Sequence, residues 1–388
     1  MDVSQRINRN LTALKPNDIL AFNLEVGAIP GILRLTLGEP DFTTPEHVKA
    51  AGMHAIAANQ SHYTPPRGLP SLRAAAAEFF ANKYGVHYNP DTEVLVTVGA
   101  TEAIFSSLMT VLNPGDTVIL PSPAFPLYES VIRVCGASPI AINTEPDGFI
   151  LRPERLEQAL EENRDTVKAV VLNYPTNPTG VTYTRADLEA LAAVLQKYAV
   201  FVISDEIYSE LTYTGTHVSM GEVLREQTVL ISGVSKSHAM TGWRIGIMCG
   251  PEAIISEIAK VHEYAVTAAT TPAQVAAEEA FRSGADDAAP MKAEYVRRRD
   301  YFVPELEKMG FSVANPDGAF YLFAKIPEKF GTDSWNFCRR LAHEAKVAIV
   351  PGASFGPGGE GYVRISYAAA MEDLVEAVAR MKPFVAAE

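Results

Sequence analysis

The middle of the chain alternates short runs of apolar residues with longer segments in which apolar residues recur every three or four positions. The apolar runs cover residues 93–99, 117–123, 167–175, 200–208 and 228–233. Helical spacing is found in 100–112 and 187–198, and an acidic helix is expected before residue 167. Continuous apolar strands between amphipathic helices are typical of a parallel sheet that is buried on both faces. The pattern therefore predicts an α/β fold.

The pattern changes near residues 284–292, where a charged helix at 292–310 leads to a second set of strands. These strands are expected at 320–326 and 361–368 and indicate a smaller α/β domain. We predict an N-terminal segment, 1–45, that packs with this small domain. Residues 46–284 then form the large domain and residues 285–388 the small C-terminal domain.

Composition narrows the class of protein. The 388 residues are 47% hydrophobic, which is enough for two domains, and 46 acidic against 33 basic residues give a net charge of -13. This balance does not favour nucleic-acid binding or a polybasic membrane patch, and no apolar run reaches membrane-spanning length. The polar start, MDVSQRINRN, is not expected to be a secretory signal.

The cysteine pattern narrows the class of protein further. Cys135, Cys249 and Cys338 are far apart and lack CxxC spacing, so we expect neither a disulfide framework nor a metal site. A cytoplasmic location is the resulting prediction.

The stretch SGVSKSHAMTGWRIG, residues 232–246, carries the most specific chemistry. Lys236 lies among small residues, and Arg244 follows eight positions later. A lysine amine can form a Schiff base with an aldehyde when its pKa is lowered, and an arginine fork matches phosphate oxygens. A cofactor with both groups is pyridoxal 5'-phosphate. Because a surface lysine and arginine around a turn would look the same, the rest of a pyridoxal site must be found elsewhere.

A second candidate is the sequence Gly99-Ala100-Thr101, which ends one predicted strand and opens a helix. A helix N-terminus offers free N–H groups and a positive dipole end, which together can bind a phosphate. Glu102 would then have to point away from the phosphate. The alternative is an ordinary helix N-cap by Thr101.

Two further candidates follow neighbouring strands. Phe125, among the prolines of 121–129, could stack on a planar ring, or it could be a core residue. Asn177 precedes a proline in 173–180, and its amide could donate to a phenolate oxygen, although Asn-Pro commonly marks a turn.

Asp205 directly follows a buried apolar run, and Tyr208 comes three residues later. A carboxylate beside a pyridine nitrogen would keep that nitrogen protonated, so that the ring withdraws electrons from a substrate carbanion. Tyr208 could hydrogen-bond the ring oxygen. The alternative is a helix N-cap aspartate.

Arg364 lies inside an otherwise apolar strand, 361–368. Charged residues are seldom buried without a partner, so this guanidinium needs an anion. An internal carboxylate or a substrate carboxylate would satisfy it.

Together, these motifs resemble the class I and II aminotransferases of pyridoxal-phosphate fold type I, from LTLGEPDF near residue 38 to RISYA near residue 367. The resemblance implies a large domain with a mostly parallel seven-stranded sheet flanked by helices, and a smaller α/β domain. It also implies a homodimer with composite active sites.

The resemblance assigns each candidate a role. Lys236 is similar to the lysine that binds the cofactor aldehyde, and Asp205 to the partner of the pyridine nitrogen. Asn177 and Tyr208 resemble the residues that bind the phenolic oxygen, and Phe125 resembles the stacking aromatic. The remaining roles are the phosphate cup (Ala100, Thr101, Ser235, Arg244), the anchor of the substrate carboxylate (Arg364, with Asn177 and the backbone of Gly38) and the tyrosine that reaches the phosphate of the neighbouring subunit (Tyr63).

The stretches SHAMTGWRIG, DGAFYLFAKIP and PGASFGPGGEG resemble aromatic amino-acid and N-acetyl-diaminopimelate aminotransferases in particular. We therefore expect a ping-pong transamination from an amino acid, in the first place an aromatic one, to a 2-oxo acid such as 2-oxoglutarate. Phe22, Phe355 and the partner's Tyr63 are the expected pocket walls. Thr101 occupies a position where some aspartate-preferring relatives carry a lysine, which weakens the case for a dicarboxylate specialist.

Alternatives remain open at this point. N-acetyl-diaminopimelate and aspartate are alternative donors, and a carbon–sulfur β-lyase uses the same cofactor. A regulator built on this fold would carry a helix-turn-helix module ahead of it. The lysine motif comes too early in this chain for that module, and the N-terminal residues lack basic helices.

Overall fold

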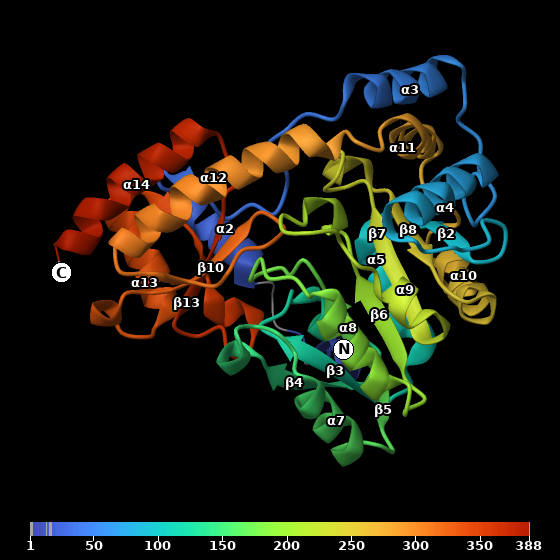
Figure 1. The fold of residues 1–388 in the computed structure, drawn as a ribbon, viewed down its shortest axis with the longest axis horizontal. Helices are drawn as coiled ribbons and strands as arrows, with labels where there is room; N and C mark the ends of the chain where they lie inside the picture. The colour runs from blue at the N-terminus through green and yellow to red at the C-terminus, as the bar shows by residue number, and fades with distance from the viewer. Residues whose placement is uncertain (1–2, 13, 15–17, 388) are drawn as a thin grey trace.

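The computed structural model describes residues 3–12, 14 and 18–387, and its centre is a seven-stranded sheet (Figure 1). The strand order is β2-β8-β7-β6-β5-β3-β4. All strands point in one direction except β8, which is antiparallel to both of its neighbours. The bounds are β2 (Val94–Thr97), β3 (Thr117–Ser122), β4 (Ser138–Asn143), β5 (Val167–Asn173), β6 (Phe201–Asp205), β7 (Thr228–Gly233) and β8 (Gly246–Cys249). The predicted α/β fold with a mostly parallel seven-stranded sheet is confirmed.

Helices cover both faces of this sheet because neighbouring strand residues point to opposite sides. Val118 packs in one core with α5, α6 and α10, whereas Ile119 packs in another with α7 and α8. A third core joins α4 and α11 to β2 and β8. The helices are α3 (Glu46–Ala57), α4 (Pro70–Tyr84), α5 (Gly99–Val111), α6 (Leu127–Val134), α7 (Pro153–Glu162), α8 (Arg185–Leu195), α9 (Met220–Val223), α10 (Glu252–Val266) and α11 (Thr271–Ser283).

A second, four-stranded antiparallel sheet has the order β12-β13-β10-β9. Its strands are β9 (Ser312–Val313), β10 (Tyr321–Lys325), β12 (Val350–Pro351) and β13 (Tyr362–Ser366). The helices around it are α2 (Asp18–Gly27), α12 (Ala288–Lys308), α13 (Ser334–Arg340) and α14 (Met371–Ala386). In Figure 1, α14 lies beside this sheet, away from the seven-stranded one, and α12 runs from this sheet toward α11.

The N-terminal residues contact this second sheet region. Strand β1 (Leu33–Arg34) pairs in parallel with β11 (Val347–Ala348), and Phe22 and Val26 of α2 share a buried core with Val363. The division of the chain at residues 45 and 284 stays a prediction.

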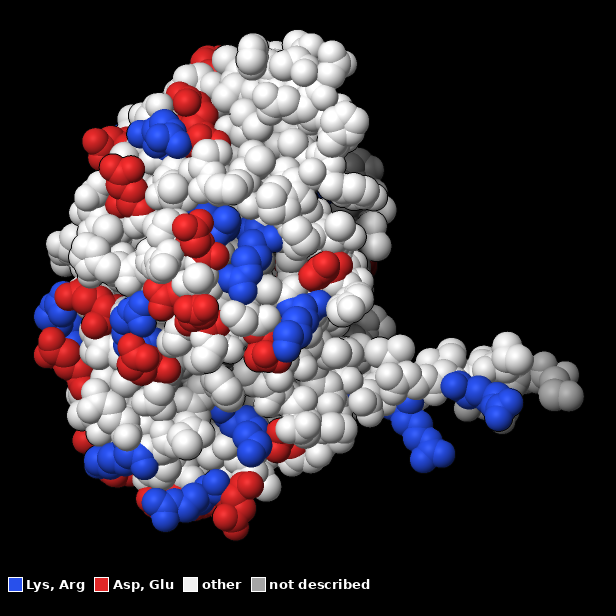
Figure 2. All heavy atoms as spheres, turned by 90° about the vertical axis from the view of Figure 1, so that its right-hand side faces the viewer, with Lys and Arg blue, Asp and Glu red and all other residues white. Residues whose placement is uncertain are grey.

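Short elements complete the chain. They are α1 (Arg9–Thr12), the 3-10 turns η1 (Val3–Arg6), η2 (Glu145–Asp147), η3 (Ser209–Leu211), η4 (Arg225–Gln227), η5 (Thr241–Trp243), η6 (Glu328–Phe330) and η8 (Gly352–Phe355), and one π-helical turn, η7 (Leu341–Ala345). Within the described part of the chain, no helix has the length and apolar character needed to cross a bilayer. Acidic and basic side chains are interspersed on the face drawn in Figure 2.

Candidate active site

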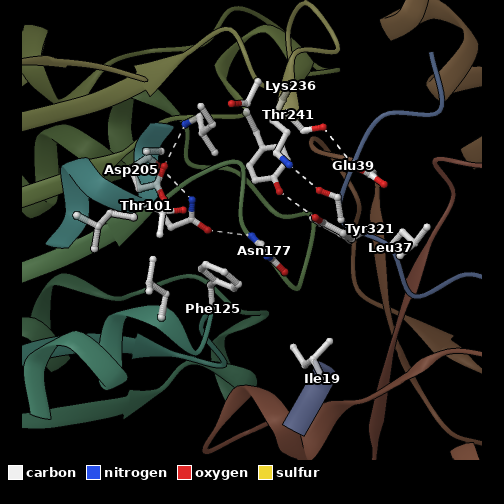
Figure 3. Close-up of a pocket in the computed structure, with 18 of the residues that line it drawn as sticks. Ile19, Leu37, Glu39, Thr101, Phe125, Asn177, Asp205, Lys236, Thr241 and Tyr321 are labelled. Carbon is white, nitrogen blue, oxygen red and sulfur yellow. Dashed lines mark hydrogen bonds between the residues drawn. The ribbon is translucent and has the colours of Figure 1, made fainter. Parts of the chain in front are cut away.

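A cavity of about 500 Å³ lies where the carboxyl ends of the central strands face the second sheet (Figure 3). Ligands of open α/β sheets collect at this edge. All but one of the residues predicted to bind the cofactor or to anchor the substrate carboxylate line the cavity: Gly38, Ala100, Thr101, Phe125, Asn177, Asp205, Tyr208, Ser235, Lys236, Arg244 and Arg364. The exception is Tyr63, whose side chain is 88% exposed and lies outside the cavity of its own chain.

Lys236 lies in the turn that follows β7 and points into the cavity from the side of the large sheet (Figure 3). Its Nζ donates a hydrogen bond to the carbonyl oxygen of Gly38, 2.5 Å away. Burial lowers the pKa of Lys236 to about 8, although Glu39 and Asp205 oppose the shift. A lowered pKa makes more of the neutral amine available near neutral pH, and the neutral amine is the form that attacks a carbonyl or accepts a proton.

Asp205 is the last residue of β6, and its side chain is nearly inaccessible to solvent. Burial raises the pKa of this carboxyl to about 6, although hydrogen bonds from Tyr128 and from the Ile207 N–H favour the ionised form. The Tyr128 hydroxyl donates to Oδ2 at 2.7 Å, and Ile207 N donates to Oδ1 at 3.2 Å. The alternative of an α-helix N-cap is wrong, because β6 is followed by a turn and the 3-10 turn η3.

Tyr128 is a cavity residue that the sequence did not predict. Replacement of Tyr128 by Phe removes a hydrogen bond to a charged acceptor, which typically contributes about 1.5–3 kcal/mol. We expect the pKa of Asp205 to rise by roughly 1–2 units, so that the acid limb of the kcat/KM pH profile moves to higher pH. Steady-state rates between pH 5.5 and 9 measure this shift. The matched control is Tyr301→Phe, because Tyr301 does not line the cavity, and superimposable profiles for Tyr128→Phe and wild type would contradict the prediction.

The phosphate-binding candidates meet at the first turn of α5. This helix begins at Gly99 and its N-cap residue is Val98, so the alternative role of Thr101 as N-cap is wrong. Gly99 has φ +75°, and a Cβ at this position would lie 2.4 Å from Nη2 of Arg244. The guanidinium therefore lies directly against the helix N-terminus, and Nη1 donates to the Thr241 carbonyl at 2.8 Å.

Glu102, in the same first turn, does not line the cavity. Its carboxylate accepts a hydrogen bond from the Val98 N–H at 3.1 Å. It also lies 3.1 Å from Nδ1 of His262. Glu102 therefore points away from the cavity.

Arg364, on β13, is 3% exposed and closes the opposite end of the cavity. Nη1 donates to Oδ1 of Asn177 at 2.9 Å, and Nη2 donates to the carbonyl of Thr36 at 2.8 Å. Nε has no hydrogen-bond partner among the described residues. Neither acceptor carries a charge, so this buried cation still needs an anion, and a substrate carboxylate fits that need.

Tyr321, on β10, is a second cavity residue that the sequence did not predict. Its hydroxyl lies 2.8 Å from that of Tyr208, and the Arg364 guanidinium lies 4.6 Å from its ring centroid. A Cβ at position 38 would lie 2.7 Å from the Tyr321 hydroxyl, so a larger residue at position 38 would displace this hydroxyl.

The two aromatic pocket walls expected from the sequence do not line the cavity. Phe22 is buried edge-on against Trp335, and its place is taken by Ile19, Leu20 and Asn23 of the same helix. Phe355 is buried behind Arg364, 5.1 Å from its guanidinium, and supports it from outside the cavity.

The donor set fits pyridoxal 5'-phosphate. An amine of lowered pKa (Lys236) can bind the aldehyde, a buried carboxylate (Asp205) suits a protonated pyridine nitrogen, and the N-terminus of α5 with Arg244 suits a phosphate. The close approach of Arg244 to Gly99 gives this phosphate seat two independent donors.

Comparisons with known proteins agree with the geometry. The family model "Aminotransferase class I and II" matches residues 30–381. The Bacillus subtilis protein named "Probable N-acetyl-LL-diaminopimelate aminotransferase" is 45% identical over 98% of this chain and 95% of its own length. Aromatic-amino-acid aminotransferase 2 of Thermococcus litoralis is 37% identical over 97% of both chains.

A solved structure is similar over the same range. Aspartate aminotransferase from Thermus thermophilus, determined with maleate, is 38% identical, covers 97% of this chain and 99% of its own, and superposes with a TM-score of 0.91. The fold, the cavity and these relatives lead to one conclusion: the chain belongs to the class I and II aminotransferases and is a pyridoxal 5'-phosphate-dependent transaminase.

Proposed function

We propose that this aminotransferase takes its amino group from an aromatic amino acid and passes it to 2-oxoglutarate. The choice of an aromatic donor rests on the small set of cationic side chains in the cavity. Among the described residues that line the cavity, the cationic side chains are Lys236, Arg244 and Arg364. Each has a role at the cofactor or at the α-carboxylate, so none of the described residues that line the cavity is a further cation for the side-chain carboxylate of aspartate.

Much of the remaining cavity wall is apolar and therefore suits an aromatic side chain. Ile19 and Leu20 come from α2, and Leu37 and Ile104 complete an apolar lining. Burial of an apolar side chain on such a wall contributes about 25 cal/mol per Å² of area removed from water. Asn23 and Thr101 add uncharged polar groups, which would have to hold the distal carboxylate of 2-oxoglutarate.

The chain's own groups divide the reaction between them. When bound, pyridoxal 5'-phosphate supplies an aldehyde for the amino group and a ring that withdraws electrons from the α-carbon. Arg364 holds the substrate carboxylate and so orients the Cα–H bond. Lys236 Nζ takes the proton from that carbon and later returns a proton, and Asp205 holds a proton at the ring nitrogen.

N-acetyl-LL-diaminopimelate is the second candidate donor, and it rests on the relative of that name at 45% identity. Its distal end combines a carboxylate with an acetamide, for which Asn23 is the suitable partner. The names of the relatives cover aromatic, N-acetyl-LL-diaminopimelate and aspartate donors, and the lining of the cavity favours the aromatic class.

A screen of amino donors against 2-oxoglutarate tests the proposal. We expect kcat/KM for phenylalanine, tyrosine or tryptophan to exceed that for aspartate by at least about tenfold, because the pocket meets a side-chain carboxylate with uncharged groups, Asn23 and Thr101, and not with a cation. Preference for aspartate, or for N-acetyl-LL-diaminopimelate, would contradict it. Incubation with cystathionine without an acceptor gives the β-lyase control, in which pyruvate and ammonia should not appear.

We further propose a homodimer in which Tyr63 reaches the phosphate of the partner subunit, and a cytoplasmic location stays a prediction. Support comes from large hydrophobic side chains of α3 and α10 that are exposed in the single chain. Met53 and Ile56 of α3 are 63% and 64% exposed, and Tyr264 of α10 is 92% exposed. The upper right part of the face in Figure 2 carries few charged side chains, as expected of a surface that a second copy covers.

A further inference from the structure

His262, on α10, is fully buried just behind the phosphate end of the cavity. Its Nδ1 lies 3.1 Å from Oε2 of Glu102, and its Nε2 lies 2.9 Å from the carbonyl oxygen of Pro66. The first contact reaches the opening turn of α5. The second reaches the loop between α3 and α4 that carries Tyr63. None of the roles described so far uses this imidazole.

The hydrogen-bond partners of His262 determine the combined charge of His262 and Glu102. A carbonyl oxygen only accepts, so Nε2 must carry a proton, and an ionised carboxylate also only accepts, so Nδ1 must carry one too. The imidazole is then a cation beside an anion. If the proton sits on Glu102 instead, both groups are neutral. In either arrangement one proton is shared and His262 and Glu102 together carry no net charge.

This neutrality matters because of where Glu102 lies. Its backbone belongs to the first turn of α5, beside the residues Ala100 and Thr101 that line the cavity. The positive end of the helix dipole favours an anion there, and a bare Glu102 carboxylate would compete with a phosphate for that field and repel it. A partner that removes the charge of Glu102 leaves the helix end available.

We propose that His262 is a positioning residue for cofactor binding, which neutralises Glu102 and thereby preserves the N-terminus of α5 as a phosphate seat. The same ring fixes the loop at Pro66, so one side chain joins the phosphate seat to the segment that bears Tyr63. The proposal rests on the assignment of α5 and Arg244 as the phosphate site.

The test compares two ligands of the full-length protein after the cofactor has been removed. Pyridoxal 5'-phosphate and pyridoxal share the aldehyde and the ring but differ in the phosphate, so the ratio of their dissociation constants, read from absorbance titrations, isolates the phosphate seat. We expect His262→Gln to weaken binding of pyridoxal 5'-phosphate on the order of tenfold and to leave binding of pyridoxal unchanged. The double variant His262→Gln/Glu102→Gln should recover most of the loss, because it removes the uncompensated charge.

Two controls separate the ways in which the proposal can fail. His343→Gln, at an exposed position, should leave both dissociation constants unchanged. Arg244→Gln should lower the affinity for pyridoxal 5'-phosphate selectively, and an unchanged ratio in that variant would overturn the phosphate site on which the proposal rests. With Arg244→Gln behaving as expected, an unchanged ratio in His262→Gln, an equal loss for both ligands, or no recovery in the double variant would each overturn the role of His262 itself.

Discussion

Lys236→Ala is expected to lower kcat at least about 10⁴-fold, because the variant loses both the amine that binds the aldehyde and the base that moves the α-proton. The lowered pKa of Lys236, to about 8, and its contact with Gly38 mark it as the amine of the cavity that is available in neutral form. The cofactor should still bind non-covalently through Arg244 and the N-terminus of α5. Steady-state transamination assays and an absorbance titration of the cofactor measure the two effects separately.

The matched control for this variant is Lys197→Ala, because Lys197 is 57% exposed on the surface and pairs with Glu157. It should retain wild-type kcat. Appreciable turnover by Lys236→Ala would show that another group performs the proton transfer. In the wild type, borohydride reduction followed by peptide mapping should place the cofactor on the peptide that contains Lys236 and on no other.

Asp205→Asn is expected to lower kcat by about 10²–10³-fold, which is the usual cost of removing one preorganised electrostatic partner. An amide does not hold a proton at the pyridine nitrogen as a carboxylate does, so the electron-withdrawing power of the ring falls. Rates with the best donor at pH 8, where the carboxyl of Asp205 (pKa about 6) is ionised in the wild type, give the comparison. A loss of less than about tenfold would mean that the carboxylate only caps the turn after β6.

The same substitution should stabilise the protein when the cofactor is absent. Because burial raises the pKa of Asp205 from 3.8 to about 6, the folded state binds this proton more tightly than the unfolded state does. Stability is therefore lost as the pH rises from about 4 to about 6, by on the order of 2–3 kcal/mol in total. Asn carries no such penalty. The melting temperature of cofactor-free Asp205→Asn should exceed that of wild type at pH 8, and by less at pH 5.

The control for this stability effect is Asp165→Asn, at an exposed position, which should not change the melting temperature at either pH. Equal melting temperatures of wild type and Asp205→Asn at pH 8 would show that the buried carboxylate carries no penalty. A lower kcat together with a higher melting temperature in Asp205→Asn would show that this residue supports activity at the expense of stability.

The strands that the sequence predicted are those with an unambiguous local signal. β5, β6 and β7 are continuous apolar runs, and a strand buried on both faces leaves that pattern. β4 and β8 were not predicted. β4 is an edge strand with partly exposed residues, and β8 has only four residues directly after the lysine motif, so neither gives a run long enough to stand out.

The site residues, too, could be predicted where the local sequence is unusual and were missed where it is not. Lys236, Asp205 and Arg364 are charged residues in apolar or small-residue surroundings, and such an anomaly can be seen in the sequence. Tyr128 and Tyr321 were missed because their importance depends on contacts 77 and 113 residues away in the chain. Phe22 is on the correct helix but on the wrong face of it, since a helix turns its residues to different sides and only contacts identify which side meets the cavity.

Asp205 owes its position to the register of β6. Ser204 pairs with Leu172 and Asp205 with Asn173, and the same two residues pair with Leu230 and Ile231 on the other side. Because consecutive strand residues alternate between faces, the deletion of a single residue from β6 would turn the carboxylate to the opposite face of the sheet. Insertions and deletions accumulated during evolution are therefore expected at the amino-terminal edge of the sheet, in the connections that enter β5 and β6, and the lengths of these two strands should stay fixed.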